Sequence, residues 1–451
     1  MSIASAVAVH RFGLGPQAGE IAAADDPMVW LDAQITSKAA LIDASNLPSS
    51  KTALDTFTTL REHRKSLRSG NASAKAVSAL EGVIETQRGA LRKEVQTRMA
   101  HSVTTPAPFA DRWARFWSNH FTVAATRAET IGLAGPYERE AIRPHVFGRF
   151  ADLLKAAVLH PGMLLYLDNH RSVGPSTRIA SRRGLGLNEN LAREVLELHT
   201  LGVNGGYGQS DVESLAKALT GWMPFAPRVL RTSVTGSGMF VSPAHEPGPK
   251  SLLGKRYPSD GQDQAKAMLA DLARHPATAA HVARKLAQHF LADEPPKAAV
   301  DALSKSFRGS GGNLSALART VVRLEGAFEA PLRKVKTPEE LMIASARMLG
   351  QRAVFGQAKR AIEGFAQRPF GAPSPAGWPD TAEAWLSPDA LQKRIDWAGN
   401  VAKRARQRPD AFVEDALGPL ADLALLTAIA RAESPAQGLT LALMSPQFQR
   451  R

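Results

Sequence analysis

The chain has 451 residues, of which 44% are hydrophobic and 22% charged, and it contains no cysteine. This composition is typical of a globular protein of two or three domains, and the lack of cysteine excludes disulfides, thiolate nucleophiles, covalent c-type haem, cysteine-bound iron–sulfur clusters and thiolate zinc sites. The excess of 56 Lys and Arg over 42 Asp and Glu gives a net charge of +14, which favours nucleic acid, anionic glycans or acidic membrane surfaces as partners.

No membrane or export segment is expected. No run of about 18 apolar residues occurs, so the sequence predicts no transmembrane segment. Residues 1–10 lack the basic start of a secretory signal, and this absence favours the cytoplasm.

We expect a mainly α protein, a multi-helix architecture with a small β-hairpin insertion near residues 225–257. Ala, Leu, Arg, Glu and Gln dominate, and apolar residues recur at intervals of three and four. The N-terminal helical region is predicted over residues 1–100. It should contain a helical hairpin, because Ser, Gly and Asn interrupt two charged helical stretches at residues 66–78.

A central helical core is predicted over residues 101–222. Within it, residues 170–187 are rich in Gly, Ser and Arg and carry no acid, which indicates a long basic loop.

The β insertion is expected over residues 223–260. Residues 229–234 and 239–241 on either side of a Gly-Ser-Gly turn predict a hairpin, and residues 250–257 predict a third strand. A C-terminal helical region, 261–451, should pack with the core as one unit.

The most organised segment is a helix predicted over residues 188–202. Asn188 is a good N-cap and Gly202 a good residue to follow the last turn. At 100° per residue, Leu191, Val195 and Leu198 form an apolar stripe. A second, polar stripe holds Asn190, Arg193, Glu194 and Glu197.

Glu194 and Glu197 are the leading candidates for chemistry. Two carboxylates at i and i+3 can share a metal or a proton, as in helical carboxylate sites and acid/base pairs. Arg193 and Glu197 are also spaced for an ordinary ion pair, so a structural polar face is the alternative interpretation.

Three further residues are candidates to complete such a site. His120 lies on an aromatic helix face, where it is either a core histidine or a neutral acid/base group. Asp168 ends an apolar run before the basic loop, which also suits a turn. His245 lies in a rigid turn of the β insertion.

A basic stripe is predicted on the helix around residues 281–290, where Arg284 and Lys285 accompany His281 and Gln288. It could oppose the Asn190, Glu194 and Glu197 stripe, either as an ion-pair network or as the other wall of a cleft.

Motifs for bound cofactors are missing. The Gly-rich residues 203–208 lack the Lys-Ser/Thr ending of a phosphate loop, so no nucleotide is expected. The histidines show no His-Glu-x-x-His spacing, which leaves the metal unknown, and a His- or carboxylate-bound divalent metal is compatible with the sequence. No Gly-x-Ser-x-Gly elbow indicates a serine hydrolase.

Residues 188–202, followed by an acidic capping box and by Leu219-Thr220-Gly221-Trp222, resemble the signature of the bacterial "domain of unknown function 1800" family. The resemblance covers nearly the whole chain, through segments 10–15, 116–121, 164–169, 245–248, 253–254, 275–279, 283–286, 377–379 and 445–448. Glu246 stands where the family resemblance implies an Asp beside His245.

The resemblance implies no settled activity. Family members are often encoded beside a sulfatase-like family, which implies a sulfatase-like partner protein and, by association, envelope or polysaccharide biology. Export alongside a twin-arginine partner would place the chain in the periplasm or envelope.

Three functional hypotheses follow, and whether the protein is an enzyme stays open. The first is an envelope- or polysaccharide-associated hydrolase or lyase. Glu194 and Glu197 would act as acid/base groups or ligands, and His120, Asp168 or His245 would complete the site. Substrate-binding groups would be Asn190 and three cations that hold an anionic group, Arg193, Arg284 and Lys285.

The second hypothesis is a non-catalytic binding or assembly module for an acidic partner protein or an anionic glycan. Nucleic-acid binding ranks third, because aromatic residues are only 6% of the chain and no nucleic-acid motif accompanies the basic run at residues 403–408.

Overall fold

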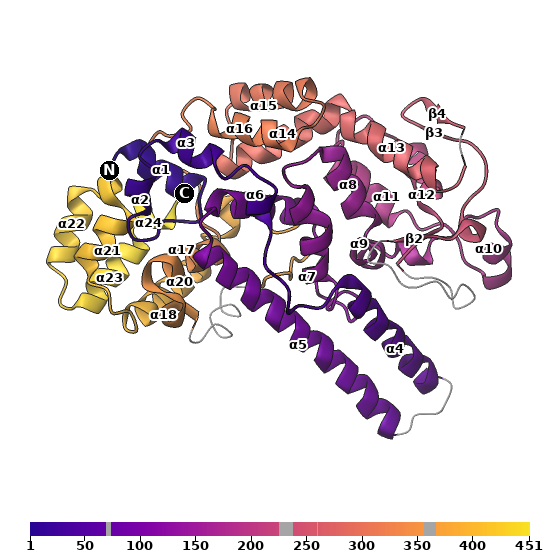
Figure 1. The fold of residues 1–451 in the computed structure, drawn as a ribbon, viewed down its shortest axis with the longest axis horizontal. Helices are drawn as coiled ribbons and strands as arrows, with labels where there is room; N and C mark the ends of the chain where they lie inside the picture. The colour runs from indigo at the N-terminus through magenta and orange to yellow at the C-terminus, as the bar shows by residue number, and fades with distance from the viewer. Residues whose placement is uncertain (69–73, 225–237, 259, 356–366) are drawn as a thin grey trace.

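The computed structural model describes residues 1–68, 74–224, 238–258, 260–355 and 367–451. Helices dominate (Figure 1), which confirms the mainly α prediction. No helix of these ranges is both long and apolar enough to cross a membrane.

The first helices of the chain lie beside the last ones. In Figure 1 the amino-terminal end packs near the yellow carboxy-terminal helices, and His10 Nε2 is 2.7 Å from the carbonyl oxygen of Ala416. The first elements are α1 (Ile3–Arg11), α2 (Glu20–Ala23), α3 (Pro27–Asp32) and the 3-10 turn η1 (Lys38–Ala40).

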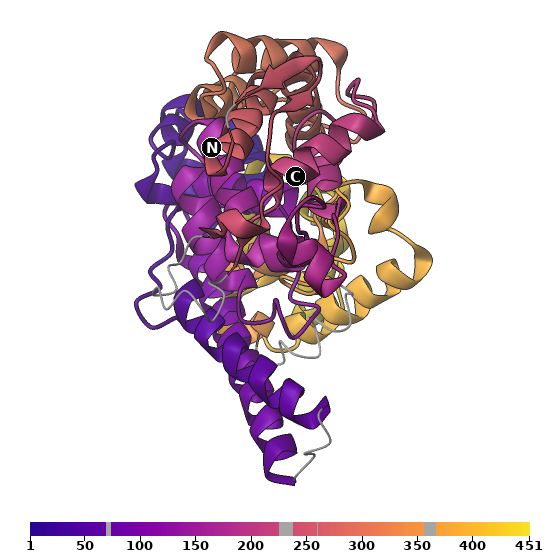
Figure 2. The same ribbon diagram turned by 90° about the vertical axis from the view of Figure 1, so that its right-hand side faces the viewer.

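A helical hairpin projects from the body, as Figures 1 and 2 both show. It consists of α4 (Ser50–Arg68) and α5 (Ala74–Thr104), which pack along each other. The inner end of α5 enters the body and supplies Arg98 to the site described below.

The central helices follow. They are α6 (Pro108–His120), α7 (Ala134–Tyr137), η2 (Glu138–Ile142), η3 (Arg143–His145), α8 (Phe150–Leu159), α9 (Pro161–Tyr166), η4 (Asn169–Arg171), α10 (Arg178–Arg183), α11 (Asn190–Glu194), η5 (Val195–His199) and α12 (Gln209–Leu219). The predicted basic loop at residues 170–187 therefore contains the short helix α10.

The helix predicted over residues 188–202 is shorter and less regular than expected. It begins at Asn190, with Glu189 as N-cap, and from Val195 it continues as the π-helical segment η5. The wider π turn rotates the following side chains, so His199 is buried and Leu198 only half-buried. Of the predicted apolar stripe, Leu191 and Val195 are buried and Leu198 is less so.

The β insertion differs from the prediction in its pairing. Strand β2 (Met239–Phe240) pairs with β1 (Trp222–Met223), while β3 (Lys250–Leu252) and β4 (Lys255–Tyr257) form a separate two-stranded hairpin. Residues 250–257 are thus two strands around a turn at Leu253 and not one. The predicted strand 229–234 lies outside the described residues.

The carboxy-terminal part of the chain is again helical. Its elements are η6 (Ser242–Ala244), α13 (Gln262–Arg274), α14 (Pro276–Phe290), α15 (Lys297–Gly309), α16 (Leu314–Val322), α17 (Pro338–Leu349), α18 (Gln351–Phe355), η7 (Ala382–Ala384), α20 (Pro388–Ala402), α21 (Pro409–Ala416), η8 (Gly418–Leu420), α22 (Leu423–Ala430), α23 (Pro435–Met444) and α24 (Pro446–Gln449).

Two large apolar cores hold these helices. The larger core joins α6, α8, α12, α13, α14 and α16, and a second core joins α17, α20, α21, α23 and α24. Helix α6 carries Trp113 and Trp117 into the larger core, and both side chains are fully buried. The opposite face of α6 is polar, and it lines a cavity between the two cores.

Candidate functional site

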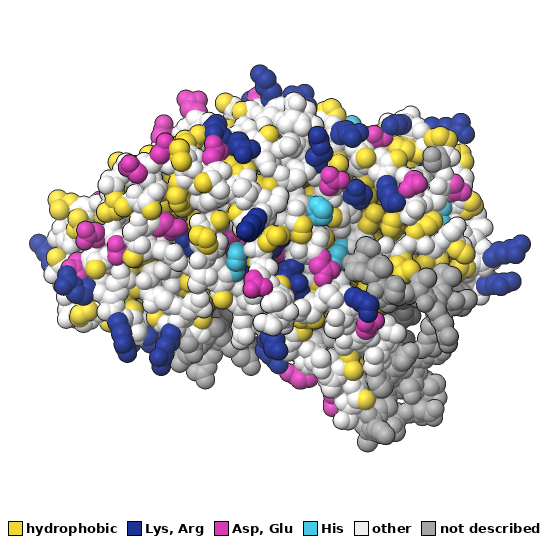
Figure 3. Space-filling model, in the orientation of Figure 1, with side chains coloured by type: hydrophobic (Ala, Val, Ile, Leu, Met, Phe, Trp, Pro, Cys, Tyr) yellow, Lys and Arg dark blue, Asp and Glu magenta, His cyan; other side chains and the backbone are white. Residues whose placement is uncertain are grey.

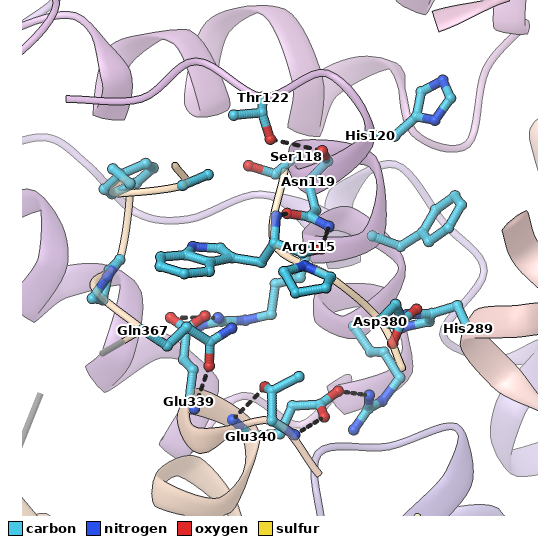
Figure 4. A pocket seen from close by; sticks show the side chains of 18 of the residues that line it. Arg115, Ser118, Asn119, His120, Thr122, His289, Glu339, Glu340, Gln367 and Asp380 are labelled. Carbon is cyan, nitrogen blue, oxygen red and sulfur yellow. Dashed lines mark hydrogen bonds and ion pairs between the residues drawn. The ribbon is translucent and has the colours of Figure 1, made fainter. Parts of the chain in front are cut away.

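The cavity lies where α6, α14 and the start of α17 meet residues 367–380, which we call the cover segment. Its volume is about 280 Å³, close to the lower limit of small-molecule sites in proteins. Figure 4 shows its polar side chains converging from these elements, including Arg115, Glu339, His289 and Asp380.

The cover segment is fixed to α6 by backbone and side-chain bonds. Asn119 accepts a hydrogen bond from Trp378 N at 2.8 Å and donates one to Trp378 O at 2.9 Å. Gly377 has a φ of 84°, and a Cβ there would lie 2.5 Å from Asn119 O. Only glycine therefore allows this close approach.

The floor of the cavity is a network of paired charges. Arg98 Nη1 and Arg115 Nη1 lie 2.5 and 3.0 Å from Glu339 Oε1. Arg112 pairs with Glu340, which Arg451 also contacts at 2.9 Å. Each floor arginine is thus neutralised by a carboxylate.

His289 and Asp380 form a hydrogen-bonded pair at the wall. His289 Nδ1 is 2.6 Å from Asp380 Oδ2. Arg451 Nη2 lies 3.2 Å from the other oxygen, Oδ1, and Lys334 Nζ lies 3.6 Å from it. Asp380 is consequently held in place on both sides.

The pair fixes the protonation of the imidazole. Burial opposes ionisation of Asp380, but His289, Arg451 and Lys334 outweigh it and lower the pKa of Asp380 to about 2. An ionised carboxylate can only accept, so Nδ1 carries the proton. Burial lowers the pKa of His289 to about 4, so at pH 7 the ring is neutral and Nε2 holds a lone pair.

His289 Nε2 is buried and has no hydrogen-bond partner among the residues that the structure describes. A histidine oriented by a carboxylate, with its second nitrogen unpaired at a cavity, is the arrangement of a general base.

Two of the predicted site residues, His120 and Lys285, do line this cavity. His120 donates through Nε2 to His199 O at 3.1 Å, and its ring packs on Phe116 and Phe121. Lys285 lies one turn before His289 on α14.

Glu194 and Glu197 lie away from the cavity lining. Arg193 pairs with Glu189 at 3.0 Å and with Glu197 at 3.6 Å, so the predicted i, i+4 ion pair exists. Burial, and then the charge of Glu197, raise the pKa of the half-buried Glu194. Asn190 is exposed at the start of the same helix.

The other predicted residues are also apart from the cavity. Asp168 lies between α9 and η4 with a φ of 56° and pairs with Arg127 at 3.1 Å. His245 is buried, with Nδ1 2.9 Å from Thr220 O and Nε2 3.0 Å from Asp260 Oδ1.

The two predicted polar stripes do not meet. Arg284 is exposed, and His281 Nε2 bonds to the backbone oxygen of Leu198 at 3.0 Å. In the described ranges, no ion pair joins Arg284 or Lys285 to Glu194 or Glu197.

Sequence reasoning missed His289, Asp380 and the floor carboxylates Glu339 and Glu340. The stripe of His281 and Lys285 continues to His289 at the same four-residue interval, and this signal could have found it. Asp380 directly follows the Gly377-Trp378-Pro379 motif. No sequence pattern around Asp380 indicates that it pairs with His289.

No group of three or more His, Asp or Glu side chains in the described part of the chain is arranged to hold a metal ion.

Comparison with known proteins gives one match. The family model described as "Protein of unknown function (DUF1800)" matches residues 7–450. No curated protein and no solved structure matches the chain.

Proposed function

This chain belongs to the DUF1800 family, and we propose that it is a hydrolase or lyase whose general base is His289. One observation carries the proposal. The Nε2 atom of His289 holds a lone pair, is unpaired within the described ranges and belongs to a residue of the cavity wall. A neutral imidazole in that state accepts a proton from water or substrate.

The pair His289–Asp380 performs the proton transfers of either reaction. In hydrolysis Nε2 removes a proton from water as the water oxygen bonds to the electrophilic atom of the substrate. The bond from that atom to the leaving oxygen then breaks, and the leaving oxygen takes the proton from the imidazolium. In elimination Nε2 removes the proton from a substrate carbon, and a carbon–carbon double bond forms as the carbon–oxygen bond to the leaving group breaks. The leaving oxygen then takes the proton from the imidazolium. Asp380 stabilises the imidazolium in both cases.

A glycan-like substrate is the class that we propose for this site. The family resemblance associates such proteins with polysaccharides and the envelope, and a net charge of +14 suits an anionic polymer. Figure 3 shows Lys and Arg side chains interspersed with Asp and Glu over the visible face. Because this face mixes both signs of charge, we assign selective recognition to the cavity.

The test is product formation from oligosaccharides that carry carboxylate or sulfate groups, with neutral oligosaccharides beside them, in ¹⁸O-labelled water. Mass spectrometry separates the reactions, because hydrolysis adds the label and elimination does not. We expect His289→Gln and Asp380→Asn to lower the rate by roughly 10²- to 10⁴-fold, as for loss of a general base.

Two control variants make the result specific. Asp293→Asn removes a carboxylate that also binds Lys334 but does not contact His289, and it should keep the parent rate. Glu194→Gln tests the carboxylate pair on the signature helix. If Glu194→Gln abolishes turnover while His289→Gln does not, the site lies on that helix and the proposal is wrong.

The alternative function, a non-catalytic binding or assembly module, gives a different result. The parent would then bind an acidic glycan or partner without any product, and His289→Gln would bind equally well.

A further inference from the structure

Lys285 is a cation without a partner inside the cavity. It lies on α14, lines the cavity, and makes no hydrogen bond or ion pair with any residue that the structure describes. The floor cations Arg98, Arg112 and Arg115 are each bound to a carboxylate. Among these four groups only Lys285 is free to bind a ligand.

Neutral histidines surround this ammonium group. His120 from α6, His199 from η5 and His281 from α14 each have their pKa lowered, by burial and then by Lys285. The ring of His120 is 6.1 Å from those of His199 and His281. None of the three supplies a negative charge.

The anionic group that acts on Lys285 is Asp380, which also lines the cavity. Asp380 already binds His289 at 2.6 Å and Arg451 at 3.2 Å. Its charge is therefore shared among groups nearer to it, and Lys285 is left incompletely neutralised.

Desolvation makes an unpaired charge at this position unfavourable. Burial lowers the pKa of Lys285 to about 8, so the side chain is still mostly protonated at pH 7. A half-buried charge without a close partner destabilises the folded protein, and a bound anion would remove that cost.

We propose that Lys285 binds an oxyanion of the substrate, a carboxylate, sulfate or phosphate group, and so makes the site selective for an anionic unit. The catalytic meaning of this subsite rests on the proposed function, but anion binding itself does not depend on turnover.

The position of Lys285 also restricts where the reacting bond lies. Lys285 and His289 are spaced i, i+4, which places their Cβ atoms about 6 Å apart on the same helix face. The anionic group and the bond attacked must then belong to the same substrate unit or to adjacent units. A cavity of about 280 Å³ fits one such unit better than a polymer segment.

Calorimetric titration with sulfate, inorganic phosphate and acetate tests the subsite on the full chain. We expect one site in the parent, at least about 10-fold weaker binding in Lys285→Met, and unchanged binding in Arg284→Met, whose cation is exposed on the same helix. Binding should weaken above pH 8, as Lys285 loses its proton. The three probes show which oxyanion the subsite prefers.

A second measurement serves if Lys285→Met does not fold. Reductive methylation with formaldehyde and cyanoborohydride, followed by peptide mass spectrometry, should modify Lys285 more slowly when the anion is present. The exposed Lys38 should react at the same rate with and without the anion. Equal modification of Lys285 in both conditions, or equal binding by parent and Lys285→Met, would overturn the proposal.

Different results would contradict the general base His289 and the anion subsite at Lys285. If no anion binds but His289→Gln abolishes turnover, the subsite is wrong and the general base stands. If anion binding depends on Lys285 while His289→Gln turns over normally, the subsite stands and the general base is wrong.

Discussion

Burial lowers the pKa of both His289 and Lys285, yet at neutral pH His289 is uncharged and Lys285 is charged. The pKa of His289 is lowered to about 4 and that of Lys285 to about 8. Between these values His289 is neutral and can accept a proton, while Lys285 is charged and can bind an anion. Two groups one helical turn apart thus supply a base and a cation in the same pH range.

The pH dependence of kcat/KM should therefore be bell-shaped. We expect a rise through about pH 4 as His289 loses its proton and a fall through about pH 8 as Lys285 loses its own. In Lys285→Met the upper limb should disappear while the lower limb stays. A single rise near pH 6.5, the ordinary value for histidine, would point to an unburied base instead.

At the scale of elements, local sequence patterns predicted where the helices lie better than they predicted the geometry within each helix. The periodicity of residues 188–202 located the signature helix, because amphipathic spacing is encoded within a few turns, but the N-cap is Glu189 and not the predicted Asn188. The π-helical segment η5 was missed. It buries His199, and no local pattern in the sequence marks this wider turn.

Local sequence patterns likewise predicted only some residues of the candidate site. His120 and Lys285 could be predicted because each lies on a helix face whose periodicity is visible in the sequence. The pairing of His289 with Asp380 could not, because 91 residues separate them and the cover segment brings Asp380 across. In the sequence, residues 367–380 are a Pro- and Gly-rich segment with no marked pattern. Only the structure shows that this segment packs against α6.

Gly377→Ala should disturb the cover segment. The φ of 84° is strained for alanine, and its Cβ would lie 2.5 Å from Asn119 O, so residues around Trp378 must move. We expect a loss of stability of roughly 1 to 3 kcal/mol in thermal unfolding and weaker anion binding.

Gly399→Ala is the matched control for that change. Gly399 lies inside α20, and nothing is within 4 Å of its added Cβ. Alanine should stabilise that helix by up to about 1 kcal/mol and leave anion binding unchanged. Equal behaviour of the two variants would show that the cover segment does not depend on the close approach at Gly377.

At the scale of the whole molecule, buried charges join parts of the chain that lie far apart in sequence. Asp111 of α6 pairs with Arg143 of η3 at 2.8 Å, and Arg143 pairs with Glu138 of η2 at the same distance. Arg98 of α5 extends the network to Glu339 of α17. Arg98 and Glu339 also line the cavity, so the network helps to position the cavity floor.

Acid should unfold the protein through this network. Burial raises the pKa of Asp111, but Arg143 and Arg115 outweigh it and bring the pKa well below its ordinary value. In the same way, Arg98 and Arg143 lower the pKa of Glu138 to about 2. Both folded pKa values are depressed, so their stabilisation is complete above about pH 4.5 and is lost as the pH falls through the folded values.

Asp111→Asn tests the network directly. It leaves Arg143 with one buried partner fewer, and we expect a loss of about 3 to 5 kcal/mol at pH 7 in denaturant unfolding. Below about pH 4 the difference from the parent should shrink, because Asp111 of the unfolded parent binds a proton there, whereas the folded parent does so only at lower pH. Asp389→Asn removes an exposed i, i+4 partner of Lys393 and should cost only about 0.3 to 0.5 kcal/mol at either pH. Equal losses in the two variants would mean that the buried charges under the cavity contribute no more than a surface pair.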